Sequence, residues 1–133
     1  MRQVIYILTS LLLLSSCRQT NTYKEQLTLT KNKKLIGFKT MFLSELGDDK
    51  YDNFKEELNK EKIEIKYLND IIYVSYLEEL NACGQYDGNM KTTGDTIKLY
   101  VKLTSDEVCT STSIERIIFL IDNPDGNMKM IKR

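Results

Sequence analysis

Three cysteines and the absence of histidine limit the chemistry open to this chain. Its 133 residues include Cys17, Cys83 and Cys109 but no His, which removes the Ser-His-Asp triad, the Cys-His dyad and nearly all catalytic zinc sites. There is no Cys-x-x-Cys motif, and no histidine is present to lower the pKa of a thiol. A redox-active cysteine is therefore not expected.

The carboxylates that come closest to a catalytic pair are Glu78, Glu79, Asp87 and Glu107. A glycosidase needs two carboxyl groups about 5–9 Å apart in a cleft lined by sugar-stacking aromatic side chains. The chain has no Trp, and neighbouring glutamates on a strand point to opposite faces of a sheet. We therefore expect no enzyme.

Residues 86–89 and 123–127 bring Asp, Asn and Gly together, as calcium loops do. Neither stretch has the spacing of an EF-hand or a Glu at its twelfth position, and turn chemistry alone explains both. We expect no metal and no cofactor. Nineteen basic and nineteen acidic side chains balance, so no net-basic face for nucleic acid is expected either.

The first seventeen residues carry the strongest pattern. Arg2 is followed by an apolar run over residues 4–14, broken only by Thr9 and Ser10. As a helix this run would span about 16 Å at 1.5 Å per residue, half of a bilayer core of about 30 Å, which suits a signal peptide better than a membrane span. The tetrad Leu14-Ser15-Ser16-Cys17 resembles the lipobox of bacterial lipoproteins. A plain secretory signal or an N-terminal core helix is the alternative.

This resemblance implies a division of the chain. Residues 1–16 would be a lipoprotein signal peptide, residues 17–25 the lipidated Cys17 and a flexible tether, and residues 26–133 one domain. Acyl chains on Cys17 would anchor the protein to a membrane without spanning it. In lipoproteins an Asp after the cysteine favours the inner membrane; here Arg18 follows, which implies the outer membrane rather than the inner.

If Cys17 is lipidated, Cys83 and Cys109 remain, and an exported protein meets an oxidising compartment. We therefore expect a disulfide between them, closing a loop of 27 residues; two buried free thiols are the alternative. The chain-entropy relation gives such a bridge about 3.5 kcal/mol.

The polar stretch 105–113 is a candidate binding loop beside this disulfide. Its candidate contact residues are Asp106, Glu107, Thr110 and Ser111. Binding loops are commonly held by a rigid scaffold, although a long solvated connection would have the same composition.

The surrounding elements predict an α+β fold. Tyr51, Phe54 and Leu58 form one apolar face of a helix over residues 50–61, with Asp48 and Asp49 before it as a cap. Strands are expected over 63–67, 71–77, 89–93, 97–103, 114–122 and 128–131, with the segment 114–122 in the centre because it is apolar on both faces. Residues 35–46 fit a helix or a strand, and strand is favoured for 35–43. The expected architecture is one helix packed on an antiparallel β-sheet meander of four to six strands.

The domain itself also resembles small uncharacterised lipoproteins, through Cys-Gly-Gln-Tyr-Asp-Gly at 83–88 and Asp-Glu-Val-Cys-Thr-Ser at 106–111. That resemblance implies no activity. The expected function is a non-catalytic accessory or binding module in the cell envelope, with the membrane and an envelope protein as partners and no nucleic acid. The alternative is a periplasmic inhibitor or immunity protein against a toxin or wall hydrolase.

Overall fold

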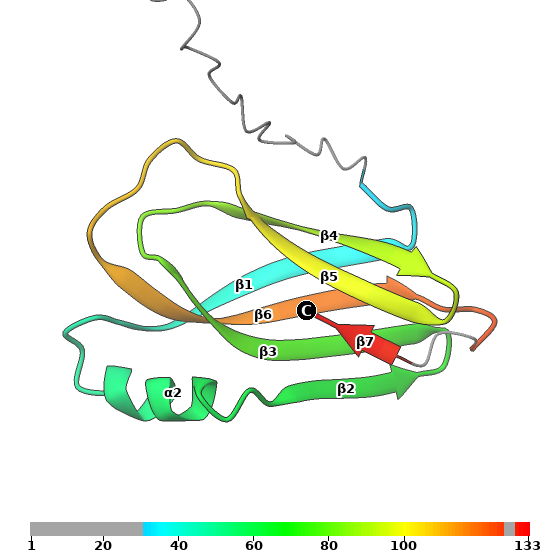
Figure 1. Cartoon of the computed structure of the whole chain (residues 1–133), viewed down its shortest axis with the longest axis horizontal. Coiled ribbons are helices and arrows are strands. Elements are labelled where there is room, and N and C mark those ends of the chain that lie inside the picture. Colours follow the sequence, from blue (N-terminus) through cyan, green and yellow to red (C-terminus); the bar gives the residue numbers. More distant parts are fainter. Residues whose placement is uncertain (1–30, 127–129) are drawn as a thin grey trace, which may run out of the picture.

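The computed structural model of the chain describes residues 31–126 and 130–133, which form a β-sandwich (Figure 1). A four-stranded sheet has the order β1-β6-β3-β2, and a three-stranded sheet of order β4-β5-β7 covers one of its faces. The elements are β1 (Leu35–Glu45), α2 (Tyr51–Leu58), β2 (Ile63–Leu68), β3 (Ile71–Asn81), β4 (Tyr86–Thr93), β5 (Thr96–Leu103), β6 (Thr112–Asp122) and β7 (Met130–Lys132). The predicted signal peptide, the predicted tether and Cys17 lie outside the described residues.

This architecture corrects the expected fold class. The described chain is mainly β, with seven strands in two sheets and one short helix, rather than α+β with four to six strands. It is not a meander, because β6 lies between β1 and β3 and because β5 pairs with β7 in parallel. The remaining pairings are antiparallel. Strand periodicity identifies each strand but carries no information about its distant partner.

Most elements lie where the sequence places them. Residues 35–43 form a strand, and the segment 114–122 lies within β6, between two other strands. The helix is shorter than predicted, and Glu61 beyond its end has a φ of +48°. The predicted cap is wrong: Lys50 precedes the helix without a side-chain hydrogen bond. Asp48 Oδ2 instead accepts a bond of 2.8 Å from the N–H of Glu45, so this carboxylate closes the end of β1.

The core lies between the two sheets. Alternate residues of β3 and β6 point into it, and β4 and β5 supply the opposite wall. Its buried members are Leu35, Ile72, Val74, Tyr76, Leu80, Met90, Ile97, Leu99, Ile117, Phe119 and Ile121. Gly88 on β4 permits close approach of the sheets, because a Cβ there would clash with the ring of Phe38 on β1.

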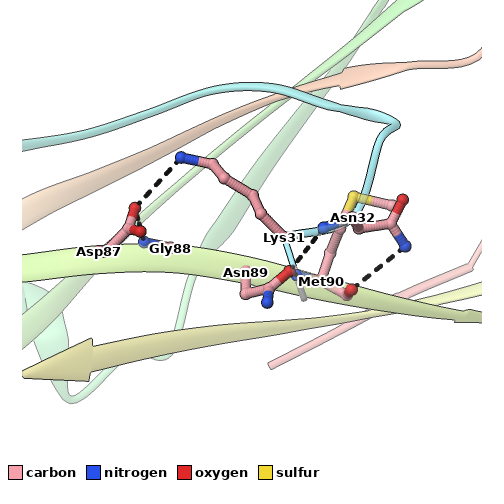
Figure 2. Close-up of polar contacts among 6 residues, drawn as sticks. All are labelled: Lys31, Asn32, Asp87, Gly88, Asn89 and Met90. Carbon is pink, nitrogen blue, oxygen red and sulfur yellow. Dashed lines mark hydrogen bonds and ion pairs between the residues drawn. The ribbon is translucent and has the colours of Figure 1, made fainter. Parts of the chain in front are cut away.

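The segment before β1 is fastened to β4 (Figure 2). Asn32 donates its backbone N–H to Asn89 Oδ1 at 3.1 Å and its Nδ2 to the carbonyl of Met90 at 3.3 Å, and Lys31 forms an exposed ion pair with Asp87. These contacts close the side of the sandwich where β1 and β4 lie together. They also fix the point at which the described chain enters the domain.

Candidate functional site

The predicted disulfide is present. Cys83 and Cys109 are bonded, with their Cα atoms 5.7 Å apart. Cys83 lies in the turn between β3 and β4, and Cys109 lies in the loop between β5 and β6. The bridge therefore joins two connections at the end of the sandwich where α2 also lies (Figure 1).

Asn81 reinforces this junction through its side-chain amide. Its Oδ1 accepts hydrogen bonds from the N–H of Cys83 at 3.2 Å and from the N–H of Cys109 at 3.1 Å. Its Nδ2 donates to the carbonyl of Cys109 at 2.5 Å. One side chain thus satisfies backbone groups of both connections, a role that sequence reasoning missed. The sequence signal for this role was an Asn two residues before a cysteine in a turn. The side chains of Asn and Asp commonly form a hydrogen bond with the backbone two residues further along the chain.

The predicted binding loop lies on the surface beside this junction. Asp106, Glu107 and Thr110 are exposed, whereas Ser111 is half-buried and its hydroxyl donates to Glu45 Oε1 at 2.5 Å. Within the loop, Ser105 Oγ donates to the carbonyl of Glu107 at 3.1 Å. The loop is therefore tied to the sandwich at both ends while its central side chains face solvent. Its binding role stays a prediction.

Glu79 on β3 belongs to a polar cluster under α2. Its carboxylate accepts a hydrogen bond of 2.5 Å from Tyr51 Oη and one of 3.2 Å from Thr112 Oγ1, and it forms an ion pair with Lys55. The bonds from Lys55 and Tyr51 favour the charged carboxylate and hold the pKa of Glu79 below its ordinary value of 4.5. The cluster docks the helix onto the sheet.

The neighbouring Glu78 has a different environment. Desolvation by burial raises the pKa of its carboxyl group, against the attraction of Arg133. Burial and the negative charge of Glu78 likewise raise the pKa of Tyr76. The guanidinium group of Arg133 lies 5.5 Å from the centre of the Tyr76 ring. The two glutamates therefore do not form one site: each has its own partners, as strand alternation predicts.

A groove of about 560 Å³ opens where the C-terminal end of α2 meets β2, β3 and β6. Lys60, Lys62 and Arg116 line it together with Glu57 and Glu64. The Oγ atom of Ser75, also in its wall, is buried without a hydrogen-bond partner in the described part of the chain. Such a groove can accept a carboxylate between cationic side chains. Sequence reasoning missed it because its residues come from separate elements and share no motif.

Comparisons with protein-family models, with curated proteins and with solved structures find no match. Across residues 31–126 and 130–133, no helix combines the length and the apolar character that crossing a bilayer would require. In the same residues, no three side chains of His, Cys, Asp or Glu gather as metal ligands would.

Proposed function

We propose that this chain is a lipid-anchored, non-catalytic binding module of the bacterial cell envelope. Its anchor is an acylated Cys17, and its location is the outer membrane rather than the inner. The lipobox-like tetrad Leu14-Ser15-Ser16-Cys17 and the absence of histidine support this proposal. The disulfide supports it further, because such bonds persist in oxidising compartments.

The observation that carries the binding role is the separation of the two ends of the sandwich. The described chain enters at the end where β1 begins, and the disulfide-bridged connections lie at the opposite end (Figure 1). β1 has eleven residues, which at 3.3 Å each amounts to about 36 Å. An anchor attached before β1 therefore leaves the bridged end on the far side of the domain, away from the point of attachment.

The surface offered to a partner is the loop of residues 104–111. Asp106, Glu107 and Thr110 face solvent, and the side chain of Val108 between them is 60% exposed. An apolar side chain among polar neighbours resembles the centre of an interface with its rim. The disulfide and the Asn81 bonds hold the loop in one shape, which reduces the conformational entropy lost on binding.

Site-specific photocrosslinking in intact cells tests this proposal. A photoreactive residue at Glu107 should give a defined protein adduct, whereas the same residue at Asp125 should give none. Asp125 is a matched control, since it is an exposed acidic residue in the turn after β6, at the other end of the sandwich. An adduct with a toxin or a wall hydrolase would favour the inhibitor alternative. Equal crosslinking at both positions, or none at Glu107, would overturn the binding role.

The anchor is tested separately. The variant Cys17→Ala should move the protein from the membrane fraction to the soluble fraction, because acyl chains contribute about 0.8 kcal/mol per buried CH₂. Cys83→Ala combined with Cys109→Ala is the control, since it removes the other two cysteines and should leave the partition unchanged. A Cys17→Ala protein that stays with the membrane would rule out the lipid anchor.

A further inference from the structure

The two edges of the four-stranded sheet differ in how they are protected. The edge formed by β1 lies beside β4, and Asn32 binds β4 directly (Figure 2). Within residues 31–126 and 130–133, the edge formed by β2 pairs with strand β3 on one side only. Residues 64–68 of β2 are all exposed, including the apolar side chains of Ile65, Tyr67 and Leu68. An open strand edge with apolar side chains is a template for pairing with another chain.

The pattern of apolar and charged residues in β2 is symmetric about Ile65. Ile63, Ile65 and Tyr67 share the face of the sheet that bears the core, because they stand opposite Tyr76, Val74 and Ile72 of β3. Glu64 and Lys66 share the other face, one on each side of Ile65. The extended segment also ends symmetrically: Glu61 and Asn69, four residues before and after Ile65, both have a positive φ.

From this symmetry we propose that the open edge of β2 pairs with β2 of a second copy of this chain, antiparallel, with a two-fold axis at Ile65. The two Ile65 residues then stand opposite each other, Ile63 stands opposite Tyr67, and Glu64 stands opposite Lys66. The two sheets join into one eight-stranded sheet, within the size range of natural sheets. Such an interface uses the same strand of both copies, as a two-fold dimer requires.

Charge selects this register over its neighbours. In the register centred on Ile65, each copy places Glu64 opposite Lys66 of the other copy, which is favourable. A shift of two residues in one direction places Lys66 opposite Lys66, and in the other direction Glu64 opposite Glu64. A shift of one residue turns the apolar face of one copy toward the charged face of the other. Within one copy Glu64 and Lys66 already form an ion pair at 2.8 Å, and both side chains are exposed on the same face of the sheet.

The strength of the pairing follows from its size. Six residues of one strand bury less area than a standard interface of about 1,600 Å², so the association is weak and depends on concentration. Covalent trapping at the two-fold axis is therefore the suitable measurement. It needs neither the lipid nor the loop of residues 104–111, so its outcome is independent of the proposed function.

The variant Ile65→Cys in the full chain tests the proposal. Residues directly opposite each other in an antiparallel pair have Cα atoms about 4.5–5.5 Å apart, within disulfide range. Mild oxidation of the purified protein should convert it to a covalent dimer on a non-reducing gel. Leu68→Cys is the matched control, because Leu68 is also exposed on β2 but its two copies would lie about 20 Å apart. Equal dimer yields for the two variants, or no dimer from Ile65→Cys, would overturn the proposal.

Charge reversal then tests the register. In the Ile65→Cys background, Glu64→Lys and Lys66→Glu should each reduce the yield of covalent dimer several-fold, because each places like charges opposite one another. The two changes together should restore the yield. The thermal midpoint of each variant checks that the fold is intact, and both residues are exposed. A double variant that crosslinks no better than the single variants would exclude this register.

Discussion

Strands β6 and β2 belong to the same sheet but have opposite surroundings. β6 lies between two strands, and Ile117, Phe119 and Ile121 on its inner face are fully buried under the second sheet. β2 lies at the edge, and only Ile63 among its six residues is even half-buried. The two strands therefore have different roles within one sheet. The central strand stabilises the fold through its buried side chains, whereas the edge strand leaves its side chains exposed to solvent. Substitutions in the two strands should therefore differ sharply in their cost to folding.

Phe119→Ala should have the largest effect. The Phe119 ring packs against Phe38, with centroids 5.1 Å apart, and against Tyr76, with centroids 6.4 Å apart. Removing a buried aromatic ring leaves a cavity between the sheets and costs about 3–5 kcal/mol. Urea denaturation of the variant and of the native chain measures the difference. A cost below about 1 kcal/mol would show that the core collapses around the missing ring.

Removal of the disulfide should have the next largest effect. Replacing both Cys83 and Cys109 by Ala should lower the free energy of unfolding by about 3.5 kcal/mol, because the unfolded chain gains the freedom of the loop that the bridge closed. Both residues are replaced so that neither is left as an unpaired partner of the broken bridge. Denaturant unfolding measures the loss, and the Asn81 bonds should keep the native loop in place. If the free energy of unfolding fell only as much as it does for a surface substitution, the unfolded chain would already be compact between residues 83 and 109 without the bridge.

The elements could be predicted from the sequence because their signals are local. Period-two alternation marks 63–67 and 97–103, and the unbroken apolar run around 117–121 correctly indicates a central strand. The pairing could not be predicted, because β6 reaches β1 across most of the chain and no local pattern records that contact. The same applies to Asp48, whose sequence suits a helix cap but whose carboxylate binds the end of β1.

The candidate sites, like the strands, could be predicted only where the signal does not depend on contacts between distant parts of the chain. The Cys83–Cys109 bridge was predictable from the number of cysteines and the expected compartment. The groove beside Ser75 was not, because Lys60, Ser75 and Arg116 meet only after the strands have paired. The symmetry of β2 about Ile65 is visible in the sequence, but its meaning depends on the strand being an open edge.

Glu79→Gln tests the attachment of α2, the helix that precedes β2. The substitution removes the charge that Lys55 and Tyr51 engage, and should cost about 1 kcal/mol at neutral pH, since the pair is partly exposed. The folded-state pKa of Glu79 lies below its ordinary value of 4.5, so its contribution is present above that value. The difference between native chain and variant should therefore shrink as the pH falls through the folded-state pKa. Thermal unfolding at a series of pH values measures it.

Glu78→Gln is the matched control for this pH dependence. Burial raises the folded-state pKa of Glu78, so its charged form costs stability at neutral pH; this cost shrinks as the pH falls below the folded-state pKa and is gone below the ordinary value of 4.5. The variant should therefore match or exceed the native stability at neutral pH, and the difference should vanish in acid. If both variants showed the same sign at neutral pH, the two glutamates would not have the opposite environments described.

Ile65→Thr should have the smallest effect on folding. Thr is also β-branched and favours strands, so the backbone preference is kept and only apolar surface is lost. Because Ile65 is 37% exposed and does not belong to the buried core, the cost should be about 0.5 kcal/mol or less in urea denaturation. A cost near that of Phe119→Ala would place β2 within the core. A small cost to folding, together with weaker self-association in sedimentation, would show that this apolar side chain contributes to pairing between copies rather than to the stability of one.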